Sequence, residues 1–432
     1  MNKVIYFVKN NIGQTLILFI AAMIPFKINV GNLAIIIAFI FALYLGVSKK
    51  LNKQNFKHIG FYFPLAFFLI TVISGLTSRN IHEGVRGIDK NLLLVLIPFV
   101  LFAIKRNNDA LKQTLIVFSF STLLATIILI VYGLIRILGG ESLEVFFFHE
   151  FSILFDLHAV YYAICLAISA FTITHYYLVD SSVKEKKFWL IVISLFILLL
   201  GIFLTASKAV IIVFSILYSI HLISFLKKGK ARIAILSFLL LVGISVINIP
   251  LLKNRFVEGL EFNIANFKPT NKLSEIKVFN NNDKNEISDL ELRYIFISIG
   301  LYHLVQDNEI FFGYGQGDIQ DKLDYYYMTY GLAPNWYEGY NVHNQYLHIL
   351  ICYGIFTLAF FLSYLVYSFY YAIKFKSLLH LFFLITICFV FIFEVALVRN
   401  KGLILFYFFN TLFLLNYSNF ENSNIRDKRG AK

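Results

Sequence analysis

The first candidate for chemistry is the pair His343 and Asn344. They lie where a long polar segment meets an apolar run that begins at Leu347. An imidazole at such a boundary contacts solvent on one side and lipid or protein on the other, which suits a group that exchanges a proton near neutral pH. Alternatively, the two residues only cap the following helix, because Asn is a preferred N-cap residue.

The second candidate is the turn Thr205-Ala-Ser-Lys208, which separates two apolar runs. An ionisable side chain at membrane depth is costly and is therefore a functional candidate, so Lys208 is singled out. Thr205 and Ser207 lie beside it and could contact a substrate. The alternative is a lysine whose apolar stem only carries its amine to the membrane interface.

The third candidate is Arg293, in a segment from Ser288 to Gln306 whose apolar residues recur at helical spacing. Asp289 and Glu291 fit the first turn of that helix, where the helix dipole favours acidic side chains. A guanidinium at the edge of the apolar face suits bidentate binding of phosphate oxygens. The alternative is an ion pair of Arg293 with Asp289 or Glu291.

Lys208, Arg293 and His343 together place two cations and one imidazole at one interface. The sequence has no Asp-x-Asp motif and no His/Glu cluster that would predict a metal site, and no cofactor is predicted. The chemistry that fits is transfer from an anionic, phosphate-linked donor. The two cations would hold a pyrophosphate leaving group without a metal, and the histidine would take a proton from an acceptor hydroxyl.

The composition identifies the environment of these residues. Of 432 residues, 59% are hydrophobic and 15% are charged, whereas a soluble domain is nearer half apolar and a quarter charged. Because a membrane span needs roughly 20 mostly apolar residues, we expect an all-α polytopic membrane protein with about 12 transmembrane helices. The predicted spans are 12–28, 31–48, 59–77, 91–104, 111–138, 158–179, 188–204, 209–226, 233–251, 346–373, 378–397 and 402–417.

Basic residues in the short loops predict the orientation. The loops after the even-numbered spans and the C-terminal tail carry Lys and Arg, which mark the cytoplasmic side. Both termini are therefore predicted to be cytoplasmic, and most of the +13 formal charge is an orientation signal rather than a nucleic-acid footprint. The predicted units are a transmembrane bundle (1–251), one large periplasmic loop with short helices (252–345), C-terminal transmembrane helices (346–417) and a cytoplasmic tail (418–432).

The outer loops contain further candidate substrate-binding residues. Asp156 and His158 open one span and could line the entry of an acceptor, although a helix cap explains Asp156 as well. Tyr340 is one of several aromatic residues in the large loop, which could form an interfacial belt or a face that stacks on sugars. Glu394, inside a predicted span, is expected to be a structural partner of Arg399 or another cation. His149 and His348 are interpreted as interface histidines.

The order of these motifs resembles the O-antigen ligase and O-antigen polymerase superfamily. The ordered set covers residues 200–402 and consists of the Thr-x-Ser-Lys turn, the Arg-bearing helix that ends in Gly313-Tyr-Gly-Gln-Gly317, and His343-Asn-Gln-Tyr-Leu347 followed by Tyr353-Gly-Ile355. The resemblance implies a bacterial inner-membrane enzyme of lipopolysaccharide biosynthesis. Such enzymes act at the periplasmic face on undecaprenyl-pyrophosphate-linked glycans, without a metal.

The resemblance also implies roles for individual residues. His343 would activate the acceptor and Arg293 would bind pyrophosphate. The turn position is usually Arg in the superfamily and is Lys208 here, which keeps the charge but loses the planar fork of a guanidinium.

Three functions remain open from the sequence. Ligation of a glycan onto lipid A core is favoured, and polymerisation of repeat units on the growing glycan uses the same donor and nearly the same chemistry. A lipid-linked oligosaccharide transporter is the more distant alternative. It would show paired halves and a charged central cavity, whereas no inverted repeat is evident and the charge gathers at the outer face.

Overall fold

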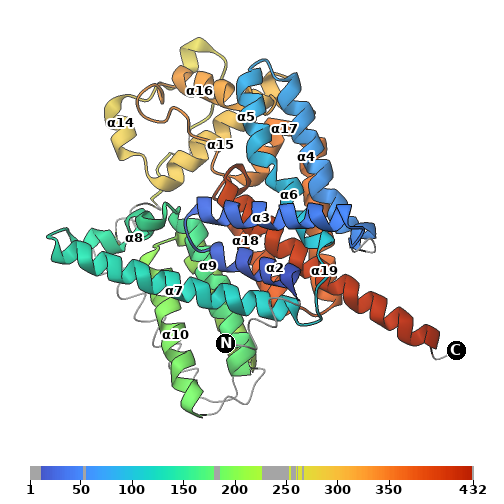
Figure 1. Cartoon of the computed structure of the whole chain (residues 1–432). Coiled ribbons are helices and arrows are strands. Elements are labelled where there is room, and N and C mark those ends of the chain that lie inside the picture. Colours follow the sequence, from blue (N-terminus) through green and yellow to red (C-terminus); the bar gives the residue numbers. More distant parts are fainter. Residues whose placement is uncertain are drawn as a thin grey trace.

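The computed structural model describes residues 11–51, 55–179, 185–225, 261–264 and 267–430, together with Lys253 and Gly259. Within these residues all regular structure is helical (Figure 1), which confirms the all-α class. The predicted span 233–251 lies outside the described residues.

The helices follow one another in three groups. The N-terminal group contains α2 (Ile12–Met23), α3 (Ile28–Val47), η1 (Asn55–Lys57), α4 (Ile59–Thr77), α5 (Ile81–Asn91), α6 (Leu93–Ala103) and α7 (Ala110–Leu138). The middle group contains η2 (Leu143–Phe146), α8 (Phe148–Ser152), η3 (Ile153–Phe155), α9 (Ala159–Ile173), η4 (Thr174–Val179), α10 (Glu185–Leu204) and α11 (Lys208–Phe225). The last contains η6 (Leu273–Glu275), α14 (Asn281–Glu286), α15 (Asp289–Gln306), α16 (Ile319–Thr329), α17 (Gln345–Lys374), α18 (Leu378–Val390), η7 (Ala396–Val398) and α19 (Asn400–Gly430).

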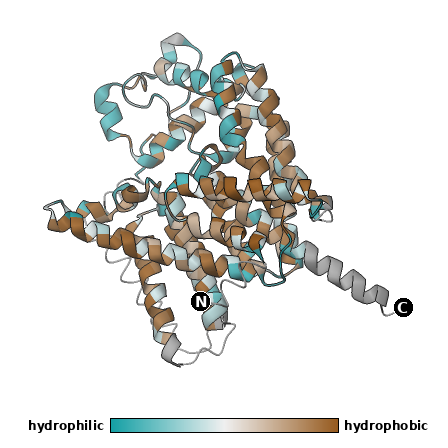
Figure 2. Cartoon of the chain, viewed as in Figure 1, coloured by the Kyte–Doolittle hydropathy of each residue, from teal (hydrophilic) through white to brown (hydrophobic). Residues whose placement is uncertain are grey.

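Several helices have the length and composition of membrane spans. Five described helices are long and apolar enough to cross a membrane: α3, α4, α7, the continuous helix Ala159–Leu178, and α17. Four shorter apolar helices accompany them, namely α2, Phe188–Leu204, Lys208–Ile223 and α18. Figure 2 shows that apolar residues dominate these helices, whereas hydrophilic residues gather on α14, α16 and α5. The helices support a membrane protein, and the count of 12 spans stays a prediction.

The helix α5 differs from the sequence prediction, which placed no element there. Asn80 caps it by accepting a hydrogen bond from Glu83 N at 3.2 Å. Gly84 lets it approach α4, because a Cβ at this position would lie 2.2 Å from the carbonyl oxygen of Gly75. The sequence of α5 is polar and amphipathic, so it did not resemble a membrane span. The close contact at Gly84 lets α4 and α5 pack together as a helical hairpin.

The two C-terminal spans also have boundaries that differ from the prediction. The helix α18 ends at Val390, before the predicted 397, and the chain then turns through η7. The helix α19 continues to Gly430, past the predicted 417. The early end of α18 places Glu394 and Arg399 on a connecting segment, so Glu394 does not lie inside a helix as predicted.

A buried polar network ties α17, α18 and α19 together. The His380 ring pairs through Nδ1 with the Tyr417 hydroxyl at 3.0 Å and through Nε2 with Asn410 Oδ1 at 2.9 Å. The Asn410 amide donates in turn to Ser368 Oγ at 2.9 Å. Because buried polar groups must be paired, this network fixes how the three helices register against one another.

The large loop docks onto the helices through its glycine motif. Tyr314 N donates to the carbonyl oxygen of Ile351 at 2.8 Å, and Gly315 N donates to that of Cys352 at 2.9 Å. Gly354 interrupts α17 with a φ of +81°, and a Cβ there would lie 2.0 Å from the carbonyl oxygen of Phe311. The Gly-Tyr-Gly-Gln-Gly and Tyr-Gly-Ile motifs thus interlock through their backbones, and only glycine fits the contact.

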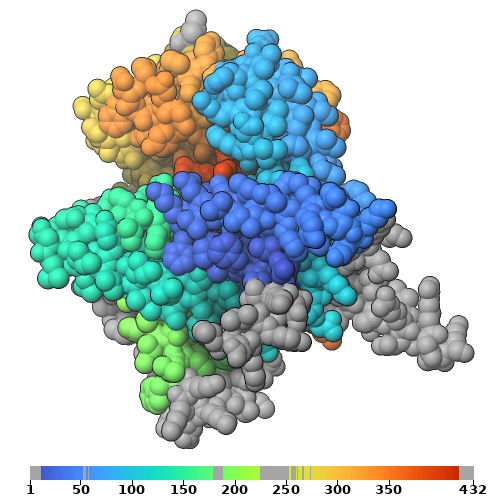
Figure 3. Space-filling model, viewed as in Figure 1, coloured from blue at the N-terminus to red at the C-terminus, as the bar shows by residue number. Residues whose placement is uncertain are grey.

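A second contact holds the other side of the loop. The Asp318 carboxylate accepts hydrogen bonds from the backbone N–H groups of Arg79 and Asn80, each at 2.8 Å. Figure 3 shows α16 and the α4–α5 hairpin side by side at the top of the molecule. These two contacts attach the large loop to α17 on one side and to the α4–α5 hairpin on the other.

Candidate functional site

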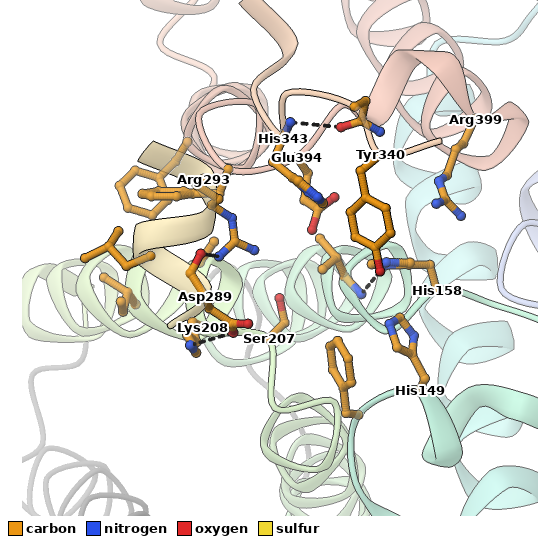
Figure 4. Close-up of a pocket in the computed structure, with 18 of the residues that line it drawn as sticks. His149, His158, Ser207, Lys208, Asp289, Arg293, Tyr340, His343, Glu394 and Arg399 are labelled. Carbon is orange, nitrogen blue, oxygen red and sulfur yellow. Dashed lines mark hydrogen bonds and ion pairs between the residues drawn. The ribbon is translucent and has the colours of Figure 1, made fainter. Parts of the chain in front are cut away.

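A cavity of about 600 Å³ lies where five parts of the chain meet. They are the first turns of α11 and α15, the segment 339–343, the corner between α8 and α9, and the chain that follows α18 (Figure 4). Its polar lining comes from His149, His158, Ser207, Lys208, Asp289, Arg293, Tyr340, Asn341, His343, Glu394 and Arg399.

Lys208 is the first residue of α11 and lines this cavity. The predicted turn before it is confirmed, and Ala206 adopts a positive φ of +46° there. The Lys208 side chain is only 15% exposed, and its Nζ donates to Asp289 Oδ2 at 3.0 Å and to the carbonyl oxygen of Gly259 at 3.4 Å. The ammonium is therefore held inside the cavity wall, and does not extend freely to an interface.

The helix that carries Arg293 begins where the sequence predicts. Ser288 caps α15 by accepting from Glu291 N, and Glu291 Oε2 accepts from Ser288 N at 2.9 Å, which completes a capping box. The other oxygen of Glu291 accepts from Asn263 N at 2.6 Å. Both oxygens of the Glu291 carboxylate thus accept backbone hydrogen bonds at the start of α15.

Arg293 contacts Asp289 through the backbone only. Its Nη1 donates to the carbonyl oxygen of Asp289 at 3.1 Å, and among the described residues it forms no ion pair with Asp289 or Glu291. Its Nε is buried, with no hydrogen-bond partner in the described part of the chain. The guanidinium therefore keeps donor capacity for a ligand in the cavity.

His343 lies in a left-handed backbone conformation, with a φ of +49°. Its backbone N donates to Asn341 Oδ1 at 2.8 Å, and its ring lies parallel to Phe296 at 6.2 Å between centroids. The Nδ1 atom is buried and has no hydrogen-bond partner within the described residues.

Burial, and then the nearby Arg293 cation, lower the pKa of His343 from 6.5 to about 4. The imidazole is therefore neutral at pH 7. A neutral imidazole is the form that can accept a proton from a substrate hydroxyl.

Asn344 acts as a helix cap. Its Oδ1 accepts from Leu347 N at 2.9 Å, and its Nδ2 donates to the carbonyl oxygen of Ile392 at 3.1 Å. The capping alternative is thus confirmed for Asn344, whereas His343 lies outside the helix and faces the cavity.

Three predicted substrate-binding residues do not line the cavity, namely Asn344, Thr205 and Asp156. The buried Thr205 hydroxyl donates to the carbonyl oxygen of Ile202 at 2.6 Å, so it shapes the turn before α11. Asp156 is exposed and terminates η3 in a left-handed conformation, with a φ of +52°. The geometry gives no support to a substrate contact for these three.

Ser207, His158 and Tyr340 do line the cavity. His158 caps α9, where its Nδ1 accepts from Val160 N at 3.4 Å. Its ring lies 4.3 Å from that of His149, measured between centroids. In Figure 4 the Tyr340 ring extends toward these two histidines, on the side of the cavity opposite Lys208 and Asp289.

Most tyrosines of the large loop serve its own core. Tyr327 and Tyr330 are fully buried, and Tyr326 stacks on His303 with 3.6 Å between ring centroids. For these residues neither the interfacial belt nor the sugar platform is correct. Tyr340 is 42% exposed and faces the cavity, so the sugar-stacking prediction stays open for this residue.

Sequence reasoning missed five polar lining residues, namely His149, Asp289, Asn341, Glu394 and Arg399. Asp289 was noted only as a possible partner of Arg293, and Glu394 with Arg399 only as a structural pair. The available signal was their position at the ends of apolar runs, where side chains from different helices gather. The pairing of Glu394 with Arg399 stays a prediction, and both line the same cavity.

The electrostatics of the cavity favour an anion beside a neutral base. Two 18-residue helices, α11 and α15, both begin at the cavity wall, and helix N-termini carry partial positive charge. Lys208, Arg293 and Arg399 add three cations, against the two carboxylates of Asp289 and Glu394. A phosphate-bearing group can therefore bind near His343.

The fold and the cavity define a helical membrane protein whose site combines an anion-binding wall with a neutral imidazole. Comparison with known families agrees with the motif order. Residues 193–362 match the family model described as O-antigen ligase, and this confirms the resemblance to the O-antigen ligase superfamily.

The matched stretch contains Lys208, Arg293 and His343 but neither the His149–His158 corner nor Glu394 and Arg399. The match supports a membrane protein that transfers glycans in the bacterial envelope, of the ligase or polymerase type. No curated protein matches the chain.

Proposed function

We propose that this protein transfers a glycan from undecaprenyl pyrophosphate onto an acceptor hydroxyl, in the manner of an O-antigen ligase. The observation that carries the proposal is that Lys208, Arg293 and His343, from three separate segments, line one cavity. The acceptor is lipid A core, and the reaction takes place at the periplasmic face of the bacterial inner membrane. Both termini are cytoplasmic in this arrangement, and the loop 252–345 is periplasmic.

The reaction assigns one role to each of the three residues. The acceptor oxygen attacks the anomeric carbon of the donor sugar, and the bond between that carbon and the phosphate oxygen breaks. The pyrophosphate leaves on its lipid carrier while Arg293 and Lys208 balance the negative charge that develops on it. His343 accepts the proton of the acceptor hydroxyl, and no metal is needed because the two cations occupy its role.

The geometry supports these roles in two ways. The neutral state of His343 at pH 7 makes it competent as a base. The buried Nε of Arg293, which has no partner among the described residues, offers a donor to a phosphate oxygen. Tyr340, His158 and His149 form the opposite wall, where the acceptor sugar would lie, with Ser207 beside the donor.

Polymerisation is the alternative, because the donor and the bond formed are of the same kind. The two differ only in the acceptor, which is lipid A core for a ligase and the growing glycan for a polymerase. A lipid-linked oligosaccharide transporter is more distant, because it would bind the same donor without breaking a covalent bond.

The glycan profile of a deletion strain tests the proposal. Lipid A core that lacks any attached chain, while long chains remain on the carrier, identifies a ligase. A core that carries a single repeat unit identifies a polymerase, and carrier-linked single units retained on the cytoplasmic side identify a transporter. Complementation should fail with His343→Ala at wild-type protein level, and an unchanged profile in the deletion strain would contradict all three.

A further inference from the structure

We propose that Asp289 is a displaceable counter-ion for Lys208, and that the diphosphate of the donor competes with its carboxylate for the ammonium. The inference rests on the proposed function, because it takes the cavity to bind pyrophosphate. It assigns to Asp289 a positioning role that sets how tightly the diphosphate is held.

The ion pair is asymmetric in exposure. Lys208 Nζ and Asp289 Oδ2 are 3.0 Å apart, but the lysine side chain is 15% exposed and the aspartate side chain is 51% exposed. The lysine is therefore the enclosed partner, and the aspartate can turn toward solvent. A pair with one half-exposed partner contributes little to folding, so its exchange for another anion is not costly.

Asp289 is linked to both phosphate-binding cations at once. Its carboxylate engages Lys208 on α11, while its backbone carbonyl accepts from Arg293 Nη1 at 3.1 Å, one helical turn further along α15. The carbonyl contact does not depend on the side chain. When the carboxylate turns away from Lys208, Arg293 therefore keeps its contact with the Asp289 carbonyl oxygen and its place in the cavity lining.

A diphosphate should bind the Lys208 ammonium more strongly than the Asp289 carboxylate does. It carries more charge than a carboxylate, and it can contact the ammonium, the guanidinium and the first N–H groups of α11 and α15 together. The Asp289 carboxylate is a single acceptor group on one residue of α15, and it engages Lys208 through one oxygen. The anion that takes over from the carboxylate thus gains contacts that Asp289 cannot make.

A carboxylate that competes with pyrophosphate can speed turnover, because pyrophosphate is part of both the substrate and the product. Binding that is equally tight in the ground state and the transition state lowers KM without raising kcat, and it slows product release. Asp289 weakens the hold of Lys208 on the carrier pyrophosphate and returns to the ammonium as the product leaves. Removal of its charge should therefore lower the donor KM and lower kcat together.

Titration calorimetry of the purified full chain with inorganic pyrophosphate tests this inference. Asp289→Asn should bind pyrophosphate about three- to tenfold tighter than wild type, because one nearby negative charge is removed. Asp289→Glu keeps the charge and should show no such gain. Glu275→Gln is the matched control, because Glu275 pairs with Lys272 at 3.1 Å outside the cavity, and its affinity should equal that of wild type.

A double-variant cycle separates the counter-ion role from a structural one. In a Lys208→Gln background, Asp289→Asn should lose most of its gain in affinity, because the ammonium it competes for is gone. Thermal melting of each variant shows whether it is folded.

Two results would overturn the inference, and they differ in what they leave standing. Unchanged or weaker binding by folded Asp289→Asn, with Lys208→Gln still weakening wild-type binding, removes the counter-ion role and leaves the proposed function intact. Failure of wild type and all variants to bind pyrophosphate removes the phosphate site itself, and with it both proposals.

Discussion

Lys208 Nζ lies 3.0 Å from Asp289 Oδ2, and this ion pair joins the first turn of α11 to the first turn of α15. Both residues line the cavity that His343 also lines.

Lys208 should be replaceable by arginine but not by alanine. If it binds phosphate mainly as a point charge, Lys208→Arg keeps much of the transfer activity, and Lys208→Ala loses most of it. Loss of a group aimed at developing charge typically costs about 10²–10³-fold in rate. The measurement is the rate of glycan transfer at equal expression. Wild-type turnover in the alanine variant would mean that Lys208 is only a structural partner of Asp289.

Gly354→Ala should destabilise the protein through the contact between the loop and α17. An alanine at a φ of +81° is strained, and its Cβ would also meet the carbonyl oxygen of Phe311 at 2.0 Å. Gly339→Ala is the matched control, because its φ is +78° but no atom lies within 4 Å of its added Cβ.

We expect Gly339→Ala to cost about 1 kcal/mol of strain and Gly354→Ala clearly more. Thermal unfolding of both variants in the same detergent gives the comparison. Equal melting temperatures for the two would show that the glycine motifs do not hold the loop.

The Lys and Arg residues in the short loops predict an orientation in which the large loop is periplasmic. Asn281 is exposed at the start of α14, so a cysteine placed there should react with a membrane-impermeant reagent in intact cells. Cys165 and Cys352 are buried and give little background. Protection of Asn281→Cys until the membrane is broken would place the loop in the cytoplasm.

The pH profile should reflect the lowered pKa of His343. The imidazole is neutral above about pH 4, so single-turnover transfer should stay constant from pH 8 to about pH 5 and fall only below that. In Arg293→Gln the second cause of the shift is removed, so the acid limb should move to higher pH, on a lower overall rate. An acid limb at pH 6.5 in wild type would show that the histidine is not buried beside a cation.

The same shift links stability to pH. The folded-state pKa of His343 is below its ordinary value of 6.5, so the unfolded chain binds the proton more readily. This group's contribution to stability is therefore complete above pH 6.5 and is lost as the pH falls toward 4. His343→Gln should flatten the dependence of the melting temperature on pH in that window.

The sequence predicted those parts of the site that depend on local patterns. The start of α15 is predicted by the capping and first-turn residues Ser288, Asp289 and Glu291. The start of α17 is predicted in the same way by the N-cap Asn344. The order of the motifs also placed Lys208, Arg293 and His343 at one interface. Each of these inferences needs only a few neighbouring residues or the end of an apolar run.

The remainder depends on contacts that no local pattern encodes. His149 and Arg399 reach the cavity because α9 and α18 pack beside α11, and that packing follows from side-chain shape along whole helices. The approach of α5 to α4 depends on one small residue, Gly84, in a segment with no span signal. The role of Asp289 as partner of Lys208 appears only once α11 and α15 are brought together.

The transfer rate of His343→Ala, with undecaprenyl-pyrophosphate-linked donor and lipid A core as acceptor, tests the central claim most directly. The ring lies at the cavity wall outside the helical core, so the variant should express and melt close to wild type. Loss of a general base typically lowers the rate by about 10²–10⁴-fold. We predict a fall of this size, and a folded His343→Ala protein that transfers glycan at the wild-type rate would contradict the account.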